Sequence, residues 1–160
     1  MKTIGLLGGM SWESSIEYYR IINETVKERL GGLHSAQCLM YSVDFAEIEA
    51  LQHAGDWDTL TQQMIHAVER LKSGGADFLV ICTNTMHRMA DEIETATGMP
   101  LLHIADTTAA AIKTKGLDTV GLLGDHGDME GDFYRGRLEK EHGLKVLVPD
   151  EVGKDVVHRI

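Results

Sequence analysis

The chain has 160 residues, with 25 Asp and Glu against 15 Lys and Arg, and a formal net charge of −10 at pH 7. This charge disfavours nucleic acid and anionic membranes as partners, and no apolar run reaches the length that crosses a bilayer. We therefore expect a cytoplasmic protein whose partner is a small molecule. Its two cysteines, without a secretory context, predict reduced thiols.

Short apolar strands alternate with helices along the chain. We predict strands at 3–7, 36–43, 78–81, 101–104, 120–123 and 144–148. We predict helices at 14–30, 45–54, 57–71 and 129–142. Three more follow strands: one that ends near 97, one that ends at 111, and one that begins at 155. Alternation of this kind, with apolar strands, is typical of an α/β fold in which a parallel sheet is flanked by helices on both faces.

Two of these helices rest on explicit patterns. Ser14 and Glu17 have the spacing of a capping box, and we expect them to act only as caps. Both helices carry an apolar stripe that we expect to face the core. The stripes are Ile16, Tyr19, Ile22, Val26 and Leu30 in the first, and Trp57, Leu60, Met64, Val68 and Leu71 in the second.

The start of the chain is repeated later in it. The run Thr3-Ile-Gly-Leu-Leu-Gly returns as Thr119-Val-Gly-Leu-Leu-Gly, so two successive units open with the same strand and glycine turn. We place the border between 113 and 118, giving a first domain at 1–115 and the beginning of a second at 116–160. The first unit carries a thiol at Cys82, and the corresponding position of the second lies beyond Ile160.

Cys82 is the strongest candidate for chemistry. In parallel sheets, ligands bind beyond the carboxyl ends of the strands, and Cys82 follows the predicted strand 78–81 directly. The amides of Thr83, Asn84 and Thr85 at a helix start would lower the pKa of the thiol and favour the thiolate. The alternative is a buried core cysteine, which is common for this residue type. Cys38, inside an apolar strand, is expected to be inert.

Several other polar residues follow strands. His87 and His103 are candidates to orient a ligand or transfer a proton, although a hydrogen-bonded structural role is at least as good an interpretation. Asp125 and Asp128 are of ligand types that suit a metal, but acidic residues also stabilise a helix N-terminus, and we favour that explanation. We predict no metal site.

Four motifs together resemble the cofactor-independent aspartate/glutamate racemase family, in particular its broad-specificity amino-acid branch. They are Gly-Gly-Met-Ser-Trp-Glu-Ser at 8–14, Cys-Thr-Asn-Thr-Met-His at 82–87, His-Ile-Ala-Asp at 103–106 and Met-Glu-Gly-Asp-Phe-Tyr at 129–134. The resemblance implies two pseudo-symmetric α/β domains, each presenting one cysteine to opposite faces of the substrate's α-carbon, without pyridoxal phosphate or metal. This chain would hold the first domain and an incomplete second one.

The resemblance also implies roles for individual residues. Cys82 would be the first-domain acid/base, Thr83, Asn84 and Thr85 would bind the α-carboxylate, and Met10 and Ser11 would line the site. Two features depart from the family pattern. A second cysteine in a Gly-Cys-Thr-Glu context has no counterpart before Ile160, and Asp125 and Asp128 stand where the family has hydroxyl side chains.

Three hypotheses of function follow. The first is an amino-acid racemase with Cys82 as one of two bases, the second being supplied by sequence beyond Ile160, another subunit or His103. The second is a one-thiol decarboxylase or isomerase of the same superfamily, and the third is a non-catalytic module that binds a small acid or a full-length partner. A nucleotide-binding domain is disfavoured because phosphate-binding motifs are absent from the sequence. Because the second unit covers its apolar strands poorly, we expect dimerisation, disorder of the C-terminal third or aggregation, and of these we favour a homodimer.

Overall fold

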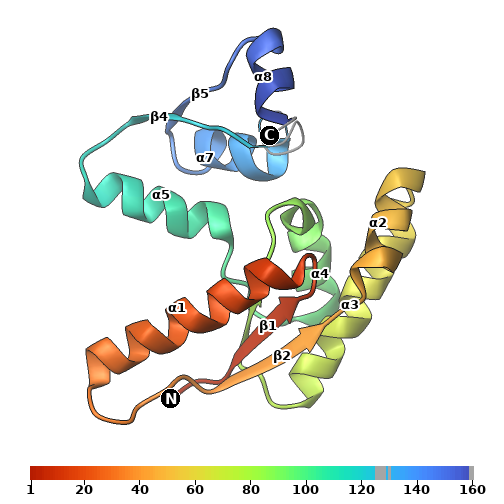
Figure 1. Ribbon diagram of the computed structural model, residues 1–160, viewed down its shortest axis with the longest axis vertical. Helices are drawn as coiled ribbons and strands as arrows, with labels where there is room; N and C mark the ends of the chain where they lie inside the picture. The colour runs from red at the N-terminus through yellow and green to blue at the C-terminus, as the bar shows by residue number, and fades with distance from the viewer. Residues whose placement is uncertain (125–128, 130, 159–160) are drawn as a thin grey trace. The chain divides into compact units, whose positions relative to one another are not determined.

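The computed structural model describes residues 1–124, 129 and 131–158, and its path is shown in Figure 1. The chain forms two compact units. The first comprises Met1–Thr83 and Met89–Leu102, and the second comprises Asn84–Arg88 and His103–Ile160.

The first unit is built on a parallel three-stranded sheet. Its strands are β1 (Ile4–Gly8), β2 (Cys38–Ser42) and β3 (Phe78–Ile81), in the order β2-β1-β3. Gly8 lies opposite Ser42 of β2, and Leu7 lies opposite Ile81 of β3. The parallel sheet flanked by helices that the sequence predicts is therefore confirmed.

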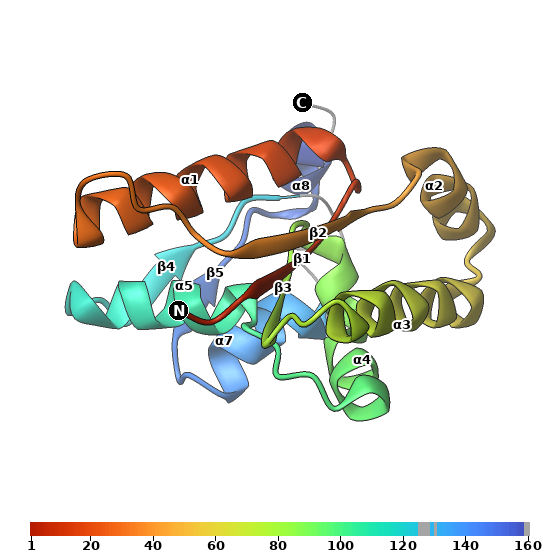
Figure 2. The same cartoon turned by 90° about the horizontal axis from the view of Figure 1, so that it is seen from below.

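Helices cover the two faces of this sheet. Figure 2 shows α1 (Trp12–Leu30) on one side and α3 (Trp57–Ser73) on the other, and the remaining helices of the unit are α2 (Phe45–Ala54) and α4 (Ala90–Thr97). The apolar stripe of α3 behaves as predicted, with four of its five members buried: Leu60, Met64, Val68 and Leu71.

The predicted stripe of α1 is wrong in part. Ile16 and Tyr19 are exposed, whereas Tyr18 and Ile22 pack against the buried residues of the sheet. The helix carries apolar side chains on two faces. The i, i+3, i+4 pattern in the sequence predicted burial for a face that is largely exposed. The capping box is also wrong, because the helix begins at Trp12 and its N-cap is Ser11, three residues before Ser14.

The predicted strand at 101–104 is reduced to one bridge. Leu101 forms an isolated parallel bridge with Leu79 of β3, and Leu102 donates its amide to the Leu79 carbonyl. The chain then turns at once into α5 (Ile104–Thr114), because the side chain of His103 caps this helix by accepting the amide of Ala105. The strand prediction failed because the helix begins inside the apolar run.

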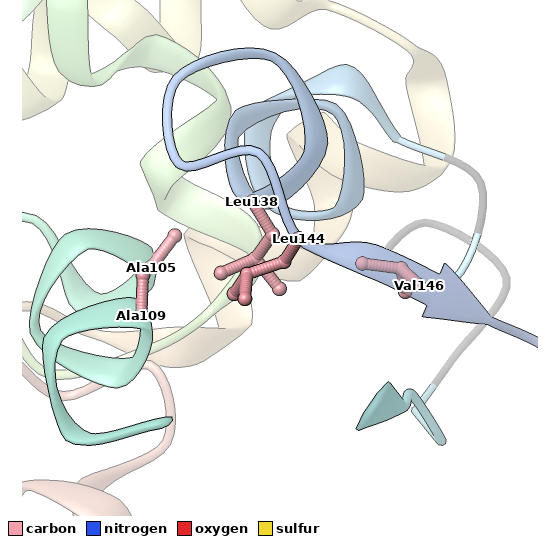
Figure 3. Close-up of a cluster of buried hydrophobic side chains, with 5 residues drawn as sticks. All are labelled: Ala105, Ala109, Leu138, Leu144 and Val146. Carbon is pink, nitrogen blue, oxygen red and sulfur yellow. The ribbon is translucent and has the colours of Figure 1, made fainter. Parts of the chain in front are cut away.

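The second unit has its own small core (Figure 3). Strands β4 (Thr119–Gly121) and β5 (Lys145–Leu147) pair in parallel, and α8 (Glu151–His158) follows β5. The core cluster consists of Ala105, Ala109, Leu138, Leu144 and Val146.

The second unit differs from the sequence prediction in one helix and in its border. The helix expected at 129–142 is interrupted, because residues Asp132–Gly136 form a π-helical turn before the short α7 (Arg137–Lys140). Helix α5 groups with the second unit because Ala105 and Ala109 belong to its core. The compact units therefore divide ahead of 113–118, and the domains 1–115 and 116–160 remain a prediction.

Candidate functional site

Cys82 lies directly after β3, at the carboxyl end of the sheet. Its amide donates a 2.9 Å hydrogen bond to the carbonyl oxygen of Leu7 on β1, which continues the strand pairing by one residue. Its own carbonyl oxygen accepts a 2.6 Å hydrogen bond from the hydroxyl of Ser14 on α1. The backbone of Cys82 is therefore fixed by the neighbouring strand and by the helix that covers the sheet.

The side chain of Cys82 is fully buried. It belongs to an apolar cluster with Leu6 and Val80, against which Tyr18 and Ile22 of α1 pack. This burial raises the pKa of the thiol to about 12, with a smaller contribution from Cys38. The expectation that a helix start lowers this pKa is wrong, because the burial of the thiol raises it instead. The segment after Cys82 forms a 3₁₀ helix at Thr85–Met89, and α4 begins only at Ala90.

The glycine turn after β1 sits beside Cys82. Gly9 has a φ of +91°, and a Cβ added there would collide with the carbonyl oxygen of Val43 after β2. A Cβ on Gly8 would lie 2.5 Å from the Ser15 hydroxyl oxygen and 4.0 Å from the Cβ of Cys82. Both positions therefore require glycine, because the turn is pressed between α1 and the ends of two strands.

The polar groups of this turn are largely engaged with one another. The amide of Gly9 donates to the Ser15 hydroxyl at 2.9 Å, so it already has a partner within the fold. The carbonyl of Ser11 accepts hydrogen bonds from the hydroxyls of Ser14 and Ser15. Met10 is buried and Ser11 is half-buried. Ser14 thus ties α1 to Cys82 and is more than the cap that we expected.

The run Thr83, Asn84 and Thr85 is divided between the units. Thr83 is the last residue of the first segment of the first unit and is half-buried, whereas Asn84 and Thr85 belong to the second unit. The carbonyl of Asn84 accepts the amide of His87, which starts the 3₁₀ helix. A role for these residues in carboxylate binding stays a prediction.

His87 and His103 form a buried pair in the second unit. Their ring centroids are 4.5 Å apart in an edge-on arrangement. Nε2 of His87 accepts the amide of Ile104, and Nδ1 of His103 accepts the amide of Ala105. Each ring therefore accepts a hydrogen bond from a backbone N–H at the start of α5. A ring nitrogen can accept only when it carries no proton, so these two bonds require neutral imidazoles. Burial lowers the pKa of His103 to about 4, assisted by His87.

Asp106 is the polar residue of this unit that sequence reasoning missed. It accepts two hydrogen bonds from Arg137, at 2.7 and 2.9 Å, and its Oδ1 lies 2.7 Å from Nε2 of His142. The bond from Arg137 is the main cause that lowers the pKa of Asp106 to about 2. No sequence signal links residues so far apart, although the 103–106 motif pointed to this segment.

A hollow at the carboxyl end of β2 was also missed. Its volume is about 290 Å³, and Arg70 of α3 and Tyr41 of β2 are among the residues that line it. The guanidinium donates a 2.6 Å hydrogen bond to the Tyr41 hydroxyl and covers its ring at 5.3 Å. This hollow shares Val43 with the surroundings of the glycine turn.

The remaining predicted positions concern metals and the second turn. Asp125 and Asp128 lie outside the described residues. Among the residues that the structure does describe, no group of three or more His, Cys, Asp or Glu side chains is arranged to hold a metal ion. Within the same residues, no helix combines the length and apolar character needed to cross a membrane.

The sequence is similar to those of known racemases. The sequence profile of Asp/Glu/hydantoin racemases matches residues 7–160. The broad-specificity amino-acid racemase of Bacillus subtilis strain 168 is 24% identical over 152 residues, covering 92% of this chain and 64% of the relative. The chain thus spans slightly less than two thirds of the length of that curated relative.

Solved structures are similar over the whole chain. A proposed Asp/Glu racemase from Yersinia pestis is 57% identical with a TM-score of 0.96, covering 100% of this chain and 70% of that one. An aspartate racemase homologue from Pyrococcus horikoshii OT3 is 32% identical with a TM-score of 0.89 and the same coverage. The aspartate racemase of Picrophilus torridus, 18% identical with a TM-score of 0.78, covers 99% of this chain and 66% of that one, and it shows the fold alone.

The family match over nearly all of the sequence and the identity to the Yersinia pestis protein agree with the motifs around the glycine turn and Cys82. The chain belongs to the Asp/Glu/hydantoin racemase family.

Proposed function

We propose that this protein acts on the α-carbon of an amino acid of the aspartate/glutamate type, and that Cys82 exchanges the α-proton without pyridoxal phosphate or metal. The observation that carries the proposal is the place of Cys82. It is held at the carboxyl end of β3 by hydrogen bonds to Leu7 and from Ser14, beside a turn that admits only glycine. Ligands of parallel sheets bind at this end of the strands.

The protonation state of Cys82 defines its role in the reaction. With a pKa of about 12, the thiol carries its proton at neutral pH in the structure described. We assign it as the acid: the S–H bond breaks, the proton forms a new C–H bond with the α-carbanion, and the thiolate remains. In the reverse direction, the thiolate removes the same proton. A base on the opposite face of the α-carbon completes a racemisation.

The second group must be one other than Cys38. Cys38 pairs with Ile4 at the beginning of β2, so it lies at the amino end of the strands, away from the glycine turn. His103 is neutral at pH 7 and accepts a hydrogen bond from the Ala105 amide at Nδ1, so its own proton is on Nε2, which can donate a proton but cannot remove one. We leave the second base unassigned.

A one-thiol decarboxylation is the second candidate function. It is favoured by the same neutral thiol, because an acid is what a carbanion requires after a carboxylate leaves as carbon dioxide. In this reaction, the C–C bond breaks, its electron pair stays on carbon, and Cys82 supplies the proton. No base on the opposite face is needed.

One experiment separates these functions. The protein is incubated with L- and D-aspartate and with L- and D-glutamate in heavy water, and the α-proton signal is followed by NMR. Loss of the signal with formation of the opposite enantiomer identifies a racemase. Exchange with retention, or loss of the amino acid with release of carbon dioxide, identifies one-sided proton chemistry. No change with any of the four substrates contradicts catalysis and leaves a binding module.

A further inference from the structure

We propose that the hollow at the carboxyl end of β2 is a second binding site, which takes a zwitterionic α-amino acid with an uncharged side chain. The carboxylate of this ligand binds Arg70 of α3, and its ammonium group binds Asp44 and Glu47 at the start of α2. The inference concerns binding away from Cys82, and it does not rest on the proposed function.

The hollow has the size of a site for a small molecule. Its volume of about 290 Å³ is close to the lower end of the range of such sites, about 300–1,000 Å³. Its lining comes from three elements, with Tyr41 on β2, Ile48 on α2 and Ala67 on α3. Helix α3 contacts both α2 and β2, and Figure 1 shows α2 and α3 beside each other. The space therefore suits a ligand of few atoms.

Arg70 supplies the positive charge of the hollow. Its Nη1 donates a 2.6 Å hydrogen bond to the Tyr41 hydroxyl, and its guanidinium carbon lies 5.3 Å from the centre of the Tyr41 ring. No carboxylate pairs with Arg70 within the residues that the structure describes, whereas His66, also in the lining, lies 3.3 Å from Glu69. A guanidinium has five N–H donors, so Arg70 keeps donors for a carboxylate. Because Tyr41 holds the side chain in advance, less entropy is lost on binding.

Asp44 and Glu47 supply negative charge from the start of α2. Asp44 is the N-cap, and its Oδ1 accepts the amide of Ala46 at 3.1 Å, while Glu47 is in the first turn. Both positions suit acidic side chains, because a helix N-terminus carries a partial positive charge. In the described part of the chain, neither carboxylate forms an ion pair with Arg70, although all three residues line the hollow. A ligand that carries both charges can bridge them.

The charges of the lining decide the class of ligand. An anion without an ammonium group is repelled by Asp44 and Glu47, and a cation without a carboxylate is repelled by Arg70. A zwitterion satisfies both sets of charges. The apolar part of the lining includes Ile48 and Ala67, which are both buried. Because burying a further charge against apolar groups is costly, the side chain of the ligand is uncharged.

The hollow is separate from the surroundings of Cys82. In the sheet order β2-β1-β3, it lies at the end of β2, whereas Cys82 follows β3 and β1 runs between them. Neighbouring strands are about 4.8 Å apart, so the ends of β2 and β3 are about 10 Å apart. An amino acid in the hollow therefore does not occupy the position of a substrate at Cys82.

The test is a titration of isotope-labelled protein followed by NMR, with L-valine as the probe. We expect the amide signals of Glu47 and Arg70 to shift until binding saturates. Isovalerate has the carbon skeleton of valine without the ammonium group, and isobutylamine lacks the carboxylate. Each should bind about tenfold more weakly than L-valine or worse, because a charged hydrogen-bonding group is missing.

Substitutions assign the two charged groups of the ligand to their partners. Arg70→Gln and Glu47→Gln should each raise the dissociation constant of L-valine by about tenfold or more. Arg29→Gln and Glu49→Gln are the matched controls, because both residues are exposed, on α1 and α2, and do not belong to the lining. We expect both controls to bind L-valine as the wild type does, with circular dichroism showing that all four variants are folded.

Three results would overturn the proposal. The first is the absence of saturable shifts at millimolar L-valine, or shifts confined to the surroundings of Cys82. The second is binding of isovalerate or isobutylamine as tight as that of L-valine, which would identify a site for a simple ion. The third is equal binding by the lining variants and their controls. None of these readouts involves turnover, so a failure here is distinguishable from a failure of the proposed function.

Discussion

The hydroxyl of Ser14 donates a 2.6 Å hydrogen bond to the carbonyl oxygen of Cys82, across the boundary between α1 and the end of β3. Because Ser14 also bonds the carbonyl of Ser11, one side chain connects the turn after β1, the helix and the candidate catalytic residue. This contact gives the glycine turn and Cys82 a common frame, and it leads to the first prediction.

Ser14→Ala should lower the rate of α-proton exchange by about tenfold, because a small displacement of a reacting group costs that much or more. The free energy of unfolding should fall by about 1 kcal/mol for the lost hydrogen bond. Thr25→Ala is the control, since the Thr25 hydroxyl bonds the carbonyl of Ile21 in its own helix. Equal exchange rates in the two variants would show that Ser14 does not position Cys82.

The turn itself can be tested at Gly9. Gly9→Ala combines a positive φ with a collision against the carbonyl of Val43, and we expect a loss of about 3 kcal/mol or more in urea unfolding. Gly55→Ala provides the comparison, because Gly55 also has a positive φ, in the left-handed helical region, but open space around it. There the strain alone should cost about 1 kcal/mol. Similar losses at both positions would argue against close packing of the turn.

The protonation state of Cys82 predicts its reactivity. With a pKa of about 12, its thiolate fraction at pH 7.5 is about three orders of magnitude below that of an ordinary thiol. We expect iodoacetamide to label Cys82 slowly in the folded protein and quickly in urea, with the site of labelling read by mass spectrometry. The rate should still be rising at pH 9.5. A plateau below pH 8.5 would mean that the thiolate is stabilised after all.

Because the fold lowers the pKa of His103, we expect the free energy of unfolding to decrease in weak acid. Its pKa falls from 6.5 to about 4 on folding, so the unfolded chain takes up the proton first as the pH decreases. The stabilisation is present in full above pH 6.5 and is lost between pH 6.5 and 4, by an amount on the order of 2–3 kcal/mol. Asp106 contributes at lower pH, because its pKa is lowered from 3.8 to about 2 and its stabilisation is lost as the pH falls through that range.

The variant His103→Asn isolates this effect. Asparagine caps a helix well and does not titrate, so unfolding of the variant should depend less on pH between 6.5 and 4 than that of the wild type. Urea unfolding at pH 7, 5.5 and 4.5 measures the difference. If the two proteins lose stability in parallel over this range, the imidazole of His103 is not held neutral by the fold.

Much of the first unit follows from local sequence patterns. The stripe of α3 and the apolar run before Cys82 predict a buried helix face and a buried strand, and both are present. These patterns are local, and in both elements the apolar side chains are the ones that are buried. The stripe of α1 failed for the opposite reason, because the helix has a second apolar face that stays exposed.

The candidate site was less accessible to sequence reasoning. Its location could be predicted because a strand end followed by a thiol and polar residues is visible in the sequence. The raised pKa of Cys82 depends on how α1 covers the sheet, which no motif encodes. The bond between Asp106 and Arg137 joins α5 to α7 through tertiary packing, and only the folded unit reveals it.

The most direct measurement compares Cys82→Ser with Cys38→Ser in heavy water, following the α-proton of aspartate and glutamate by NMR. The two substitutions are nearly isosteric, and Cys38 lies at the other end of the strands. We predict that exchange is abolished in Cys82→Ser and kept in Cys38→Ser, with both proteins folded by circular dichroism. Exchange that persists in Cys82→Ser would contradict the central claim that this thiol carries the α-proton.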